Sequence, residues 1–221
     1  MSELNFKRRE AASGEATSAV IFIHGYGADG ADLLGLAEPL AQHLPDTVFF
    51  APDAPERSAM NPMGFQWFPI PYLDGSTEVA ASEGMERSAK ALDAFVDKVL
   101  AEEALEAEQL VLLGFSQGTM LSLHIAPRRT DPIAGVIGFS GRLMRPELLA
   151  EQTVSRMPII LIHGNADDVV PFESMQEAGE ALQGAGFTVY GHVMNGTAHG
   201  IAPDGLGAAL AFLREVLPYS D

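Results

Sequence analysis

The chain has 221 residues, of which 47% are hydrophobic and 19% are charged, and its formal net charge is −17. This composition is typical of a globular protein with a sizeable core, not of a disordered chain. The acidity, without a compensating basic patch, argues against nucleic acid or an anionic membrane surface as a partner. The absence of cysteine excludes disulfides, a thiol nucleophile and thiolate metal ligands.

The beginning of the chain lacks the apolar segment of a secretory signal, and no apolar run approaches the length of a transmembrane helix. We therefore expect a cytoplasmic protein without stable insertion into a membrane. The sequence also shows no internal repeat, low-complexity segment or domain linker. We expect residues 1–221 to form a single domain.

Short apolar segments alternate with helical patterns along the chain. Alternation of this kind predicts an α/β fold, in which a mostly parallel central sheet carries helices on both faces. Each apolar segment is short, as expected for a buried strand, and the helices follow from their apolar spacing. The predicted strands are residues 18–24, 47–52, 109–115, 133–140, 157–163 and 187–194, and the predicted helices are 29–43, 82–105, 116–126, 172–183 and 205–217. Asp29 and Ser82 are the predicted N-caps of the first two helices.

Residues 52–80, which we call the flap, interrupt this alternation. The segment is rich in proline, which prevents a regular helix over its first part, and it contains the only tryptophan of the chain. Its aromatic side chains argue against a disordered linker. Long ordered excursions within a compact domain tend to be functional, so we expect the flap to lie near a site.

The segment GFSQG places Ser116 between Gly114 and Gly118, at the end of a predicted strand and the start of a helix. This pattern indicates a nucleophile elbow, in which a sharp turn holds the serine in a strained conformation and leaves no room for side chains two residues away. A glycine-flanked serine that only caps a helix is the alternative. The elbow predicts Ser116 as a nucleophile.

A serine nucleophile needs a general base, and the base needs an orienting carboxylate. On a fold with this elbow the partners follow in the order acid, then histidine, each in a loop after a later strand. Asp167 and Asp168 follow the strand 157–163, and His199 follows the strand 187–194. The carboxyl ends of parallel strands meet at one edge of the sheet, so these side chains are expected to converge on Ser116.

The remaining histidines are expected to have structural roles. His24 and His163 each end a strand and are predicted to orient loops, whereas His43, His124 and His192 lie in or near regular elements. No pair of histidines has a metal-ligand spacing such as H-E-x-x-H, so no metal site is expected.

Attack on a carbonyl creates an oxyanion, which backbone N–H groups stabilise. One donor is expected from Gln117, the residue after the nucleophile, and the second from the loop after the first strand. That loop reads HGYGADG from His24 to Gly30, and the N–H of Tyr26 is the candidate. A plain glycine-rich turn is the alternative.

The motifs HGYG, GFSQG, HGNADDVVP and AHG, in this order from about Val20 to Leu217, resemble the phospholipase/carboxylesterase family of α/β-hydrolases. The resemblance implies an α/β-hydrolase fold, a triad of Ser116, Asp167 and His199, and oxyanion donors at Tyr26 and Gln117. It favours Asp167 over Asp168 as the acid. The segment WFP resembles the tryptophan-aromatic pair that the family carries near the acyl site, whereas the flap segment PYLDGSTEVAASEG departs from the thioesterase members.

Together these features predict a serine carboxylesterase that hydrolyses short- to medium-chain acyl esters and needs no cofactor. Aromatic and aliphatic side chains of the flap either form a wall for the acyl chain or fill the core beneath it. Trp67, Phe68 and Leu73 are the predicted substrate-binding residues. An acyl-protein thioesterase, a lysophospholipase and, in another class, a non-catalytic ligand-binding protein stay open, as does a homodimer built through the flap.

Overall fold

The computed structural model describes residues 3–218. Its central sheet has the strand order β1-β3-β2-β6-β7-β8-β9. Every neighbouring pair is parallel except β1 and β3, which are antiparallel. The predicted mostly parallel sheet is confirmed. Its strands are β1 (Phe6–Arg9), β2 (Ser18–Ile23), β3 (Thr47–Pro52), β6 (Leu110–Phe115), β7 (Gly135–Phe139), β8 (Ile159–Gly164) and β9 (Val189–Met194).

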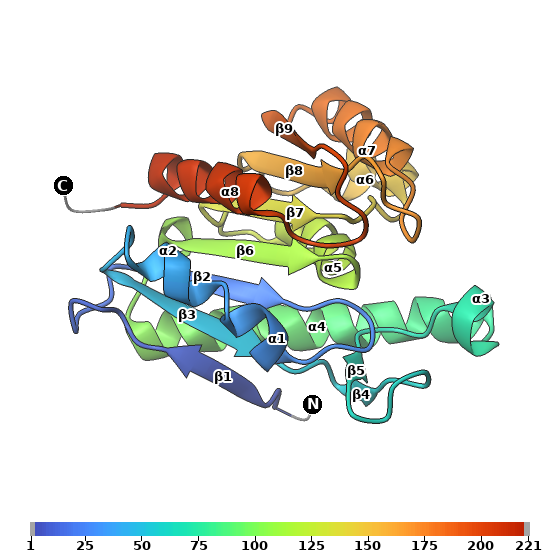
Figure 1. The fold of residues 1–221 in the computed structure, drawn as a ribbon, viewed down its shortest axis with the longest axis horizontal. Coiled ribbons are helices and arrows are strands. Elements are labelled where there is room, and N and C mark those ends of the chain that lie inside the picture. Colours follow the sequence, from blue (N-terminus) through green and yellow to red (C-terminus); the bar gives the residue numbers. More distant parts are fainter. Residues whose placement is uncertain (1–2, 219–221) are drawn as a thin grey trace.

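Helices cover both faces of this sheet (Figure 1). Alternate side chains of the buried strands β2, β3, β6, β7 and β8 enter two separate hydrophobic clusters, because successive residues of a strand point to opposite faces. One cluster lies under α1 (Gly30–Leu34), α2 (Ala37–Ala41) and α8 (Pro203–Val216). The other lies under α4 (Glu78–Glu103), α5 (Gln117–Ile125), α6 (Leu149–Gln152) and α7 (Glu173–Gly184).

The flap is ordered and contains its own short elements. These are β4 (Glu56–Arg57) and β5 (Phe65–Gln66), which pair with each other, and α3 (Pro71–Asp74). Short 3₁₀ helices occur in several connections, namely η1 (Ala107–Gln109), η2 (Ala126–Arg128) and η3 (Pro146–Leu148). In Figure 1 the flap lies beside the end of the sheet at which the parallel strands finish.

Strand β1 has no counterpart among the predicted elements. It is only four residues long and mostly basic, so its apolar pattern is too weak to predict a strand. Tertiary contacts hold it at the sheet edge: the Phe6 ring lies 5.7 Å from the ring of Phe50 and 5.3 Å from that of Phe95. The guanidinium of Arg8 lies over Phe50 and pairs with Glu103 at 3.1 Å. Positive charges on an edge strand also discourage pairing with another chain.

The predicted helix over residues 29–43 is wrong in its middle, where the chain forms two short helices. Asp29 caps α1 as predicted, through a capping box with Asp32. The break follows from Pro39, which has no N–H to donate to the carbonyl of Gly35 four residues earlier. That carbonyl instead accepts from Glu38 at 3.4 Å, and the helix restarts as α2.

The predicted start of the long helix at Ser82 is also wrong. Helix α4 begins at Glu78, and its N-cap is Thr77, whose hydroxyl accepts the N–H of Ala80 at 3.1 Å. The hydroxyl of Ser82 instead accepts a hydrogen bond from the guanidinium of Arg145. Both serine and threonine suit an N-cap, so residue type alone does not separate the two positions.

His124 makes stability depend on pH. Its side chain is buried in α5, and its Nδ1 has no hydrogen-bond partner among residues 3–218. Burial, with a smaller contribution from the charge of Arg128, lowers the pKa of His124 to about 4. The unfolded chain therefore binds a proton between about pH 6.5 and pH 4 that the folded chain does not. We expect the free energy of unfolding, measured by urea titration, to fall as pH falls through this window.

The variant His124→Leu is expected to flatten this pH dependence. Part of the pH dependence of the free energy of unfolding is expected to remain in this variant, because burial also lowers the pKa of His24. His43→Leu is the matched control, since His43 is exposed, and it is expected to keep the slope of the wild type. Equal slopes in the wild type and His124→Leu would contradict this account.

Candidate active site

Ser116 lies at the turn from β6 into α5, with φ 55° and ψ −112°. A positive φ is strained for a residue with a side chain, and such strain is concentrated at functional sites. A side chain at Gly118 would place its Cβ 1.8 Å from the carbonyl oxygen of Ile23. One at Gly114 would place its Cβ 2.4 Å from the carbonyl carbon of Gly118. The turn at Ser116 therefore requires glycine on both sides.

The loops after β8 and β9 bring an acid and a base together. Nδ1 of His199 lies 2.8 Å from Oδ2 of Asp167, whose side chain is fully buried. The other carboxylate oxygen of Asp167 accepts the N–H groups of Val169 and Val170, each at 2.9 Å. Asp168 is exposed. The structure thus places Asp167, and not Asp168, on the imidazole of His199.

The contacts of Asp167 keep it ionised. Burial alone would raise the pKa of this carboxyl, but the hydrogen bonds from His199, Val170 and Val169 outweigh burial and hold the pKa below its ordinary value. An ionised Asp167 accepts the Nδ1 proton of His199, which leaves Nε2 of the imidazole as the basic atom. His163 supports the same loop, with Nε2 at 3.0 Å from the carbonyl of Val170.

His199 lies beside the elbow. Its ring centroid is 4.8 Å from that of Phe115, the residue before Ser116. The hydroxyl of Ser116 itself makes no hydrogen bond among residues 3–218, and the side chain is 8% exposed. Catalytic hydrogen bonds are often long in ligand-free proteins and shorten when the substrate binds. The nucleophile is therefore within reach of solvent and not engaged in a structural bond.

The two candidate oxyanion donors come from segments next to Ser116. Gln117 is the first residue of α5, and the N–H groups of a first helical turn have no partner within the helix. The N–H of Tyr26 has no hydrogen bond in the part of the chain that the structure describes. Its loop passes close to the nucleophile, since a Cβ at Gly25 would lie 3.3 Å from Cβ of Ser116.

The flap holds this loop in place. The indole Nε1 of Trp67 donates to the carbonyl of His24 at 2.9 Å, and the amide of Asn61 donates to the carbonyl of Gly27 at 2.8 Å. The N–H of Gly27 donates to the carbonyl of Phe65, also at 2.8 Å. His24 itself orients the loop, as predicted, and its Nε2 accepts a backbone N–H from the flap.

The side chain of Gln117 connects the flap to the elbow, a role that the sequence pattern does not reveal. Its Oε1 accepts the N–H of Trp67 at 3.1 Å, and its Nε2 donates to the carbonyl of Phe68 at 2.8 Å. The amide is fully buried. Gln117 occupies a variable position of the G-x-S-x-G pattern, so only the tertiary structure shows that its side chain positions the flap.

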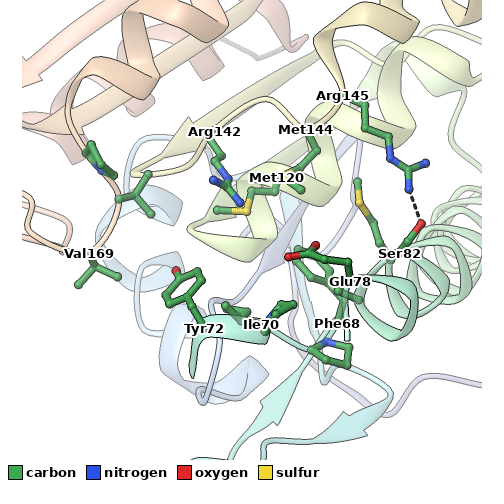
Figure 2. A pocket seen from close by; sticks show the side chains of 16 residues that line it. Phe68, Ile70, Tyr72, Glu78, Ser82, Met120, Arg142, Met144, Arg145 and Val169 are labelled. Atoms are coloured by element: carbon green, nitrogen blue, oxygen red, sulfur yellow. Dashed lines mark hydrogen bonds between the residues drawn. The ribbon is translucent and has the colours of Figure 1, made fainter. Parts of the chain in front are cut away.

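A pocket of about 370 Å³ lies between the flap, α4, α5 and the loops after β7 and β8 (Figure 2). It lies next to the candidate catalytic residues, because Met120 lies one turn after Ser116 and Val169 and Val170 follow Asp167 closely. Phe68, which the sequence predicts to bind substrate, lines this pocket. The pocket lining also includes apolar and charged side chains, namely Met85, Met144, Glu78, Arg142 and Arg145.

Two predicted substrate-binding residues lie elsewhere. Trp67 is fully buried and does not line the pocket; its backbone and indole are bonded to Gln117, His24 and Ser88. Leu73 is 42% exposed on α3 and is also not a lining residue. The aromatic content of the flap left open whether its side chains form a wall or fill the core, and it did not show which ring packs inward and which faces the cavity.

The structure contains no evident place for a metal. Within residues 3–218, no group of three or more histidine, aspartate or glutamate side chains lies close enough together to hold a metal ion. In the same range, no helix is both long and apolar enough to cross a membrane.

The family model described as Phospholipase/Carboxylesterase matches residues 6–217. The chain belongs to the phospholipase/carboxylesterase family. Members of the family are hydrolases, so the chain is a hydrolase with an α/β-hydrolase fold, as the motifs predicted.

Two members of the family show how closely the chain is related to known proteins. It is 29% identical over 221 residues to acyl-protein thioesterase 1 of Gibberella zeae, with 94% of each chain covered. Among solved structures, that of esterase PE8 is 40% identical and superposes with a TM-score of 0.92, covering 98% of this chain and 100% of the other. The similarity to both proteins extends over nearly the full length of this chain.

Proposed function

We propose that the chain is a serine carboxylesterase that hydrolyses short- to medium-chain acyl esters through an acyl-enzyme intermediate. The observation that carries this proposal is the partly buried hydrogen bond of 2.8 Å between Asp167 and His199, beside a strained serine at an elbow. Nucleophile, base and acid of this type together perform acyl transfer on unrelated folds.

In the first half of the reaction, Oγ of Ser116 attacks the ester carbonyl and Nε2 of His199 takes its proton. Asp167 stabilises the imidazolium that forms. The N–H groups of Tyr26 and Gln117 donate to the oxyanion, and each such donor typically contributes about 10²–10³ in rate. His199 then gives its proton to the leaving alcohol, which leaves the acyl group on Ser116.

In the second half, His199 takes a proton from water, and the resulting hydroxide attacks the acyl carbonyl. The tetrahedral intermediate collapses, His199 returns the proton to Ser116 and the carboxylic acid leaves. The overall change is one ester and one water converted to one acid and one alcohol. No cofactor enters any step.

The pocket beside the elbow is proposed to hold the acyl chain. Its volume of about 370 Å³ and its apolar side chains, such as Phe68, Met85 and Met120, fit a short or medium chain. The higher identity to a protein named as an esterase supports ester hydrolysis as the main activity. The cytoplasmic location and the homodimer stay predictions from the sequence.

Acyl-protein thioesterase activity is the second candidate. It is supported by relatives that carry this name, with 29% identity in Gibberella zeae and 31% over 170 residues in Yarrowia lipolytica. An ester and a thioester of the same acyl chain separate the two activities. A carboxylesterase favours the oxygen ester with a small alcohol, whereas a protein thioesterase favours an S-acylated peptide. A non-catalytic binding protein would hydrolyse none of them.

The acyl pocket gives a test by substitution. Ala81 lines the pocket on α4, and its neighbour Ala80 does not, although both are partly exposed. Ala81→Trp is expected to fill the pocket and lower kcat/KM for p-nitrophenyl hexanoate about tenfold more than for the acetate, because only the longer chain needs the filled space. Ala80→Trp is the control and is expected to leave this ratio unchanged. A ratio that is the same in both variants and the wild type would place the acyl chain elsewhere.

A further inference from the structure

Arg142 lies in the loop after β7. This loop packs closely against α5, the helix that follows Ser116. A Cβ at Gly141 would be 2.4 Å from Cβ of Thr119 and 3.0 Å from the carbonyl oxygen of Ser116. This close approach fixes the backbone just before Arg142. Its side chain then lines the pocket, and Figure 2 shows it directed toward Met120 and the space above Ile70 and Tyr72.

The guanidinium of Arg142 has no partner. Within residues 3–218 it makes no hydrogen bond and no ion pair, whereas every other arginine of that range has a polar or ring contact. Acidic partners for an arginine are abundant, because the chain has 30 acidic residues and 13 lysines and arginines. Arg145 lines the same pocket but is engaged by Ser82 and Glu86. As residues 3–218 form it, the pocket therefore presents the exposed and permanently charged guanidinium of Arg142 without a polar partner.

Glu78 is the opposing charge. It lines the pocket from the start of α4, and in Figure 2 its carboxylate points into the cavity from the side opposite Arg142. The two groups do not form an ion pair, so Arg142 stays available. Glu78 would repel an anion that Arg142 binds. The two residues are therefore expected to have opposite effects on the binding of an anionic substrate.

We propose that Arg142 is a specificity-determining residue that binds a carboxylate at the far end of the acyl chain. The proposal rests on the proposed esterase function. A pocket that is apolar along Phe68, Met85 and Met120 and carries a free guanidinium fits a chain that is apolar in the middle and anionic at its end. The favoured substrates are half-esters of dicarboxylic acids. Water converts each to a dicarboxylate and an alcohol by the Ser116 route, and Arg142 transfers no proton.

The test compares two esters of equal acyl length, mono-p-nitrophenyl adipate and p-nitrophenyl hexanoate, together with the suberate and octanoate pair. Arg142→Gln is expected to lower the ratio of kcat/KM for the anionic ester to kcat/KM for the neutral ester about fivefold, mainly through a higher KM for the anionic ester. Glu78→Gln is expected to raise kcat/KM for the anionic ester relative to the neutral ester. Added salt is expected to lower the anionic-to-neutral ratio in the wild type but not in Arg142→Gln.

Arg156→Gln is the matched control. It removes the same charge from the loop before β8, where Arg156 donates to the carbonyl of Ala185. If Arg156→Gln lowers the anionic-to-neutral ratio of kcat/KM as much as Arg142→Gln does, the effect comes from net charge and the proposal is overturned. An unchanged ratio in Arg142→Gln with both ester pairs also overturns it. Hydrolysis of the neutral esters separates these outcomes from failure of the esterase function, since a chain without that function hydrolyses no ester in the series.

Discussion

Ser116→Ala is expected to lower kcat/KM for p-nitrophenyl butyrate at least about 10⁴-fold, because no other hydroxyl can take its place. The residue is held at φ 55° between β6 and α5, and its oxygen makes no structural hydrogen bond among residues 3–218. Loss of that oxygen therefore removes the nucleophile and little else. Steady-state kinetics measure the effect, and circular dichroism shows whether the fold is intact.

Ser140→Ala is the matched control for this variant. Ser140 is also buried, also has a positive φ of 47°, and follows the neighbouring strand β7. Its hydroxyl has no partner in residues 3–218. We expect Ser140→Ala to keep activity within a small factor of the wild type. Similar losses in both variants, or full activity in Ser116→Ala, would contradict the assignment of the nucleophile.

Asp167→Asn is expected to lower kcat about 10⁴-fold while preserving the fold. The amide of asparagine can donate to Nδ1 of His199, which moves the imidazole proton to Nε2. In that tautomer Nε2 cannot accept the proton of Ser116. The effect is expected mainly on kcat, because Asp167 contacts the base and does not itself line the pocket.

Asp168→Asn makes the same chemical change one residue later and is expected to have little effect, since Asp168 is exposed. The pair of variants measures which carboxylate orients His199. A large loss in Asp168→Asn with little loss in Asp167→Asn would overturn the geometry described above.

The sheet, and the order in which the candidate catalytic residues follow its strands, were predictable from the sequence because both depend on local patterns. A buried parallel strand is a short apolar run, and Ser116 and Asp167 each follow such a run in the chain. His199 follows β9, an edge strand of mixed composition in which only Met194 is buried. Parallel strands place these loops at one edge of the sheet whatever the details of packing. The glycines around Ser116 were predictable for the same reason, since the turn itself requires them.

The features that the sequence did not predict depend on contacts between distant segments. Strand β1 is held at the edge of the sheet by ring contacts of Phe6 with Phe50 and Phe95. Trp67 is held in the interior by hydrogen bonds to His24 and Gln117. No spacing rule encodes these partners. Arg142 was equally hidden, because an arginine in a loop is ordinary until the structure shows that it lines a pocket without a partner.

The most direct test of the central claim is to trap the acyl-enzyme. The protein is incubated with a fluorophosphonate or quenched in acid during turnover of p-nitrophenyl butyrate, and the modified peptide is mapped by mass spectrometry. The account predicts one adduct per chain on Ser116, with no adduct in Ser116→Ala. An adduct on another residue, or turnover of the ester with no adduct on Ser116, would contradict it.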